Sequence, residues 1–274
     1  MFLIARPAIA ADPRPRIIAF ASENWLTVAV GTFTPGKKGW TQATDSFKPP
    51  APTDLFTLFG NTGKLGEVAG KDERRADAHW IPIEWRMRID RGDTIRQPFA
   101  LAIQGSWPED AVLARELPLD DPAAVSAVSK YLKEKGLKVE SPFLTQAYEV
   151  DLAGDGQLEK VVCAHSDMKA IVDNQPAAIY AVALIISGPP GKEKMKALAK
   201  QCSFKPASQS IEEHEHFYGT RDFYRIIAIH DIDGDGAQEI ALYRAKIDAT
   251  QIDVFTFHKG RPYKALSVDK FNYN

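Results

Sequence analysis

The dominant pattern along the chain is an alternation of hydrophobic and polar residues, which is typical of β-strands with one buried face. It is clearest over residues 80–89, where every second position is apolar: Ile81, Ile83, Trp85, Met87 and Ile89. Shorter β-branched and aromatic runs, bounded by Gly, Pro, Asn or Asp, predict further strands. These lie at 16–30 (two strands), 55–59, 64–68, 99–103, 145–150, 160–164, 179–187, 224–229, 239–243 and 251–257. The sequence therefore predicts a mainly β fold built from hairpins.

Two segments have helical composition instead. Residues 120–122 (Asp-Asp-Pro) supply a cap and a first-turn proline, residues 123–135 are good helix formers, and Gly136 ends the run. Residues 191–201 place Met195, Leu198 and Ala199 on one side of a second predicted helix. We therefore expect one or two helices beside the sheets.

Composition places the chain among ordinary globular proteins, with 274 residues of which 45% are hydrophobic and 26% charged. We expect three parts: a terminal segment at 1–11, an N-terminal β-rich module at 12–118, and a module at 119–274. Basic and acidic residues nearly balance, 34 against 36, which argues against a nucleic-acid partner. The longest apolar run, 177–186, is shorter than the roughly 18 residues of a membrane span, so no span is expected.

The first eleven residues resemble part of an export signal. Ala8-Ile9-Ala10 has the small-x-small pattern of a cleavage site, although the apolar run is short and Arg6 interrupts it. The segment is either the remnant of a signal peptide or a floppy terminus. We favour a periplasmic or secreted protein.

The most informative stretch is an acidic loop between two predicted strands. Asp231, Asp233 and Asp235 alternate with other residues, Gly236 follows, and Glu239 begins the next strand. Converging carboxylates are the hard oxygen ligands that Ca²⁺ prefers. The loop is not an EF-hand, because the twelfth position is Leu242 and because both flanks have the composition of strands.

This stretch resembles the nine-residue strand–loop–strand calcium sites of FG-GAP and VCBS-type repeats, as in integrin-like β-propellers. The resemblance implies that Ca²⁺ is bound by the side chains of Asp231, Asp233, Asp235 and Glu239 and by the backbone carbonyl of Ala237. The family more often has Asp at the last position, so Glu239 is a mild departure. The ion would serve as a structural staple.

A second copy of the loop lies 80 residues upstream and is missing one carboxylate. It contains Asp151, Asp155 and Glu159, but Ala153 stands where the first loop has Asp233. We expect weaker metal binding here, because calcium affinity depends on the number of carboxylates. Alternatively, both loops are ordinary turns, in which Asp and Gly are common.

The resemblance extends over roughly the C-terminal half, from residue 143 onward. Each loop joins two predicted strands, and a third strand follows. Two such units are fewer than the four or more blades of a closed propeller. The resemblance therefore implies hairpin-built sheets in an irregular or incomplete propeller-like arrangement.

Other candidate sites are weaker. His214 and His216 could begin a transition-metal site, but no third ligand is identifiable and we favour a solvated acidic turn for this stretch. The tripeptide 91–93 (Arg-Gly-Asp) is short enough to arise by chance. Cys163 and Cys202 could form a disulfide or could both be buried thiols. The five tryptophans are expected mainly in the core: Trp25, Trp40, Trp80, Trp85 and Trp107.

No serine-nucleophile signature of the Gly-x-Ser-x-Gly type is present. We therefore expect an exported binding or scaffold protein rather than an enzyme, with a protein or carbohydrate ligand that the sequence does not identify. The alternative is a secreted hydrolase whose active site lies on the N-terminal loops and the tryptophan-rich region.

Overall fold

The computed structural model describes residues 16–22, 25–34, 39–43, 53–75, 85–89, 99–107, 114–166, 177–189, 191–205, 223–245, 249–258 and 260–271. Within these residues the chain forms sixteen strands and one helix. Every strand pairing described is antiparallel, and most sequential neighbours pair as hairpins. The predicted mainly β, hairpin-built fold is therefore confirmed.

The N-terminal part of the chain forms a seven-stranded sheet in the order β1-β7-β4-β5-β6-β2-β3, in which β1 also pairs with β2. The predicted hairpin at 55–68 is formed by β4 and β5. The bounds are β1 (Arg16–Ser22), β2 (Trp25–Phe33), β3 (Trp40–Gln42), β4 (Leu55–Gly60), β5 (Gly63–Arg75), β6 (Trp85–Ile89) and β7 (Phe99–Gln104).

The rest of the chain forms two further sheets. A five-stranded sheet has the order β12-β11-β10-β9-β8, and a four-stranded sheet has the order β13-β14-β15-β16. The bounds of the former are β8 (Arg115–Glu116), β9 (Phe143–Val150), β10 (Glu159–His165), β11 (Ala177–Ser187) and β12 (Lys194–Lys205). Those of the latter are β13 (Phe223–His230), β14 (Glu239–Ala245), β15 (Ala249–His258) and β16 (Arg261–Phe271).

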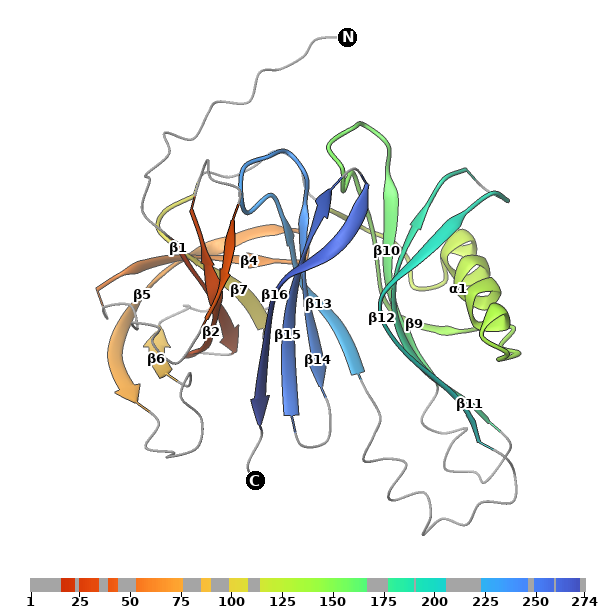
Figure 1. Ribbon diagram of the computed structural model, residues 1–274, viewed down its shortest axis with the longest axis horizontal. Coiled ribbons are helices and arrows are strands. Elements are labelled where there is room, and N and C mark those ends of the chain that lie inside the picture. Colours follow the sequence, from red (N-terminus) through yellow and green to blue (C-terminus); the bar gives the residue numbers. More distant parts are fainter. Residues whose placement is uncertain are drawn as a thin grey trace.

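The four-stranded C-terminal sheet lies at the centre of the molecule (Figure 1). One of its faces shares a hydrophobic cluster with the seven-stranded sheet, in which Phe59 and Leu101 meet Ile227 and Val254. Its other face packs on the five-stranded sheet through a second cluster, listed here by sheet: Val161, Cys163 and Ala183 against Ile226, Ile240 and Leu242. The hairpin β13–β14, which carries the acidic loop, is therefore enclosed by both other sheets.

The predicted first helix is confirmed as α1 (Pro122–Glu134), which covers the outer face of the five-stranded sheet (Figure 1). The side chain of the N-cap residue Asp121 accepts a hydrogen bond from the Ala124 N–H at 2.8 Å. Gly136, with φ of 81°, follows the helix in the left-handed region. Ala124, Val128 and Leu132 are buried.

The predicted second helix at 191–201 is wrong, because these residues belong largely to strand β12. This strand pairs with β11 along its whole length, from Lys194 opposite Ser187 to Lys205 opposite Ala177. Its side chains contact apolar neighbours on both faces, with Met195 on the α1 side and Leu198 on the side of the C-terminal sheet. Tertiary packing thus outweighs the helical propensity of Lys, Ala and Met.

The two loop-bearing units have the same topology. Each consists of four sequential antiparallel strands, β9 to β12 and β13 to β16, and the acidic loop joins the first two strands in both. The sequence pattern predicted only three strands in each unit. The fourth strands are β12, in place of the predicted helix, and β16, which the sequence did not indicate.

Candidate metal centre

The acidic loop is held between the end of β13 and the start of β14. His230 and Glu239 are paired across these two antiparallel strands, so Asp231 and Glu239 lie close together although eight positions separate them. Gly234 (φ 78°) and Gly236 (φ 95°) take left-handed backbone conformations that allow the chain to reverse. The register of β13 with β14 and the two glycines together bring the carboxylates close to one another.

Backbone N–H groups of the loop donate hydrogen bonds to the loop's own aspartate side chains. The Asp231 carboxylate accepts from the Gly234 N–H at 2.8 Å and from the Gly236 N–H at 3.1 Å. Oδ1 of Asp233 accepts from the Asp235 N–H at 3.1 Å, and Oδ1 of Asp235 accepts from an N–H at 2.9 Å. These local bonds stabilise the loop conformation.

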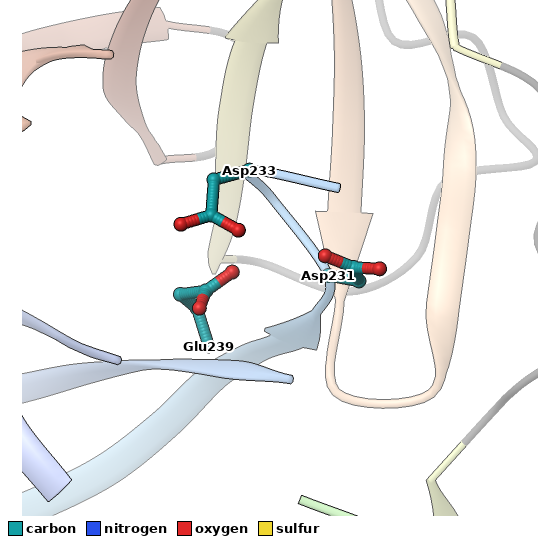
Figure 2. A group of neighbouring side chains, drawn as sticks. All are labelled: Asp231, Asp233 and Glu239. Atoms are coloured by element: carbon teal, nitrogen blue, oxygen red, sulfur yellow. The ribbon is translucent and has the colours of Figure 1, made fainter. Parts of the chain in front are cut away.

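Three of the predicted ligands form a buried acidic cluster that could hold a metal ion. Asp231, Asp233 and Glu239 each offer a carboxylate oxygen, and these oxygens lie within 4.8 Å of one another. In Figure 2 the carboxylates of Asp233 and Glu239 face each other, with Asp231 to one side. Asp235 is exposed and is not part of this group. Ala237, two residues further along the loop, is buried.

The electrostatics of the cluster disfavour three charged carboxylates in the absence of a cation. Burial, followed by the charge of Asp233, raises the pKa of Glu239 well above its usual value, although the hydrogen bond from the Ile232 N–H opposes the shift. Burial, followed by the charge of Asp235, raises the pKa of Asp233 to about 6. Both shifts indicate negative charge that lacks compensation.

One oxygen of Glu239 is unsatisfied. The side chain is fully buried, with an exposed fraction of 0%. Its Oε2 accepts a hydrogen bond from the Ile232 N–H at 2.7 Å, but its Oε1 has no hydrogen-bond partner among the described residues. An unsatisfied buried acceptor costs about 1–3 kcal/mol. The residues present therefore fit a cation, which would satisfy this oxygen.

The seven-stranded sheet lines one side of the cluster. The ring of Phe59, at the end of β4, stacks on the imidazole of His230 with centroids 3.8 Å apart, and Trp107 meets the same imidazole edge-on at 6.3 Å. The turn between β4 and β5 is seen beside Asp231 in Figure 2, and both strands contact β13. These aromatic neighbours are far away in sequence, and no local signal indicates them.

The second acidic loop has nearly the same hydrogen bonds as the first. Asp151 accepts from the N–H groups of Asp155 (3.0 Å) and Gly156 (2.8 Å), and Oδ1 of Asp155 accepts from an N–H at 2.9 Å. Oε2 of Glu159 accepts from the Leu152 N–H at 3.0 Å, as Glu239 does from Ile232. Among the described residues these carboxylates form no metal-holding group. The two loops thus have similar backbone conformations and differ in their carboxylates.

Several other predicted features can now be placed. Cys163 and Cys202 are both free thiols; they lie on opposite faces of the five-stranded sheet. Trp107 is buried and Trp40 packs against the same cluster, as expected for core residues. The histidines at 214 and 216, the tripeptide 91–93 and the terminal segment 1–11 lie outside the described residues. No helix in the described part of the chain is long and apolar enough to cross a membrane.

No family model matches this chain, and no curated protein or solved structure matches it. The acidic loop of the central sheet is therefore the observation from which a function has to be argued.

Proposed function

We propose that the protein is a β-rich binding or scaffold protein in which Ca²⁺ staples the loop from Asp231 to Glu239. The observation that carries this proposal is the fully buried Glu239, whose Oε1 is unsatisfied beside two further carboxylates. A cation at this point compensates the charge of all three groups and supplies the missing partner.

The chemistry of the donors favours calcium. All three groups are carboxylates, and hard oxygen donors in a flexible arrangement suit Ca²⁺, which takes six to eight oxygens. Asp235 and the carbonyl of Ala237, which the resemblance to FG-GAP and VCBS loops implies as ligands, would bring the number of ligand residues to five. Zn²⁺ is less suitable, because its sites contain mainly histidine and cysteine.

The burial of the cluster favours a structural role. Asp231 is 8% exposed and Glu239 is 0% exposed, and the hairpin that carries them is packed between two other sheets. A catalytic metal needs a position open to substrate, whereas a structural metal is enclosed by its ligands. Calcium here would tighten the junction of the three sheets.

Export from the cytosol is part of the proposal. Calcium modules that work outside the cytosol bind with dissociation constants of about 10⁻⁴–10⁻³ M, which suits millimolar calcium. A loop with three clustered carboxylates, of which Asp233 and Glu239 have a raised pKa, agrees with affinity in this range.

The test is calorimetric titration of EDTA-treated protein with Ca²⁺, together with melting curves with and without the ion. We expect one site and a higher Tm with calcium, and we expect Asp233→Ala to lose both effects. Glu134→Ala, which removes an exposed carboxylate of α1, is the control and should behave as wild type. Absence of both heat and Tm shift in the wild-type protein would reject the calcium site.

A further inference from the structure

The two acidic loops touch each other, although 80 residues separate them in the chain. Gln238 is the residue immediately before Glu239. Its N–H donates a hydrogen bond to the Leu152 carbonyl at 2.9 Å. Gly154 of the second loop lies against the Gly236 carbonyl of the first. The two contacts fall on either side of Ala237 and hold the last part of the metal loop.

The contact at Gly154 leaves no room for a side chain. A Cβ at this position would lie 2.4 Å from the Gly236 carbonyl oxygen and 3.1 Å from its carbonyl carbon. Both neighbours are backbone atoms, so a flexible side chain cannot move aside to make space. Any larger residue at 154 therefore has to push the two loops apart.

From these contacts we propose that the loop at 151–159 is a clasp that positions Glu239 for the metal, and that it binds no ion itself. This inference rests on the proposed calcium site. The clasp holds the backbone at Gln238, which is 2% exposed, and the next residue is the buried ligand Glu239. With its backbone fixed, Glu239 keeps its carboxylate directed at Asp233.

The clasp loop is suited to this role because it lacks one of the carboxylates that form the metal cluster of the other loop. Asp151 accepts two backbone hydrogen bonds and Glu159 accepts one, and these bonds shape the loop. Ala153 stands at the position of Asp233 and leaves the clasp loop without the carboxylate that completes the other cluster. The tip of this hairpin still contacts the metal loop at Gly236 and Gln238.

The protein offers a matched pair of variants that isolates the contact. Gly154 (φ 68°) and Gly156 (φ 85°) both take left-handed conformations, so alanine strains the backbone at either position. Only Gly154 meets another loop, because nothing lies within 4 Å of a Cβ placed at Gly156. The difference between Gly154→Ala and Gly156→Ala therefore reports the clasp.

The first arm of the experiment measures calcium affinity by calorimetry in the full-length protein. We expect Gly154→Ala to weaken binding by about 10-fold or more, the size of effect seen when a group that supports a metal ligand is removed. Gly156→Ala should change affinity by far less. Equal affinities for the two variants would overturn the clasp while leaving the calcium site intact, and absence of binding by the wild-type protein would overturn both.

A second readout separates positioning of Glu239 from a general loss of stability. Luminescence lifetimes of bound Tb³⁺ in H₂O and D₂O count the water molecules on the ion. If the clasp positions Glu239, Tb³⁺ bound to Gly154→Ala should carry more water than Tb³⁺ bound to Gly156→Ala. An unchanged water count with a lower Tm would show that Gly154 is structural only.

A third arm uses the wild-type protein and does not depend on any variant folding. Hydrogen exchange measured by mass spectrometry should slow in peptides covering 151–159 when calcium is added, in addition to those covering 231–239. Protection confined to 231–239 would contradict coupling between the loops. A calorimetric stoichiometry of two ions that falls to one in Asp151→Ala would show that the clasp loop is a second metal site.

Discussion

Replacing Glu239 by glutamine should have opposite effects on stability with and without calcium. Gln has the same shape and keeps an oxygen that can accept the hydrogen bond from the Ile232 N–H, 2.7 Å away in wild type. It replaces the unsatisfied Oε1 by an amide group that can donate toward Asp233, and it removes one of three clustered charges. In the metal-free protein this change is favourable.

The size of each effect follows from the structure. An unsatisfied buried acceptor costs about 1–3 kcal/mol, so Glu239→Gln in EDTA should gain about 1 kcal/mol, or about 2–4 °C in Tm. With calcium at 100 times its Kd, the wild-type protein gains about 2.7 kcal/mol from binding. The variant lacks a ligand and forgoes most of this gain, so the order of stability reverses.

Thermal and urea unfolding of both proteins, in EDTA and in excess calcium, measure this reversal. The matched control is Glu159→Gln, because Glu159 has the corresponding position and the corresponding hydrogen bond from Leu152 but no metal cluster. It should show no reversal. If Glu239→Gln lowers stability equally in EDTA and in calcium, Glu239 is only a structural acceptor and the argument for the metal fails.

The metal-free protein should also lose stability as the pH rises. Burial, followed by the charge of Asp235, raises the pKa of Asp233 from 3.8 to about 6, and burial raises the pKa of Glu239 as well. The folded state then binds protons more tightly than the unfolded chain, so this stabilising contribution declines between about pH 4 and pH 6 and above. In EDTA, Glu239→Gln should show a smaller decline than wild type between pH 5 and pH 7.5.

Three further predictions concern the second loop, the helix and the thiols. Ala153→Asp supplies the carboxylate that Asp233 provides in the first loop, so calorimetry should show a second, weaker calcium site; an unchanged stoichiometry would contradict the equivalence of the loops. Asp121→Ala removes the N-cap of α1 and should cost about 1 kcal/mol in urea unfolding, whereas an unchanged midpoint would show that the cap is dispensable. Burial raises the pKa of Cys163 to about 12, so a thiol reagent should modify at most Cys202 in the native protein and both cysteines in urea.

The sequence predicted the elements whose signals are local. Alternating apolar residues with turn residues between them indicated most of the hairpins, and Asp121, Pro122 and Gly136 marked the ends of α1. The acidic loop was predictable because its carboxylates lie within nine consecutive residues. The hydrogen-bonded register of His230 with Glu239 then brings the first and last of them together.

The remaining features depend on contacts between distant parts of the chain. Strand β12 was mistaken for a helix because its composition favours one, whereas β11 and two apolar clusters determine its conformation. Strand β16 was not indicated by the sequence, because proline usually interrupts a strand and Pro262 stands near its start. However, β16 is an edge strand, where proline is tolerated. The stacking of Phe59 on His230 and the contact of Gly154 with Gly236 have no local signature at all.

The comparison of the two loops also limits what calcium can do for the fold. Both loops are shaped by hydrogen bonds from backbone N–H groups to their own carboxylates, and the second loop keeps this shape with Ala153 in place of a ligand. We therefore expect the hairpin to form without the ion. Removal of calcium should lower the Tm without unfolding the protein, so the far-UV circular dichroism spectrum at 25 °C should be the same in EDTA as in calcium. A loss of β-structure in EDTA would mean that repulsion among Asp231, Asp233 and Glu239 exceeds the strength of the frame that holds them.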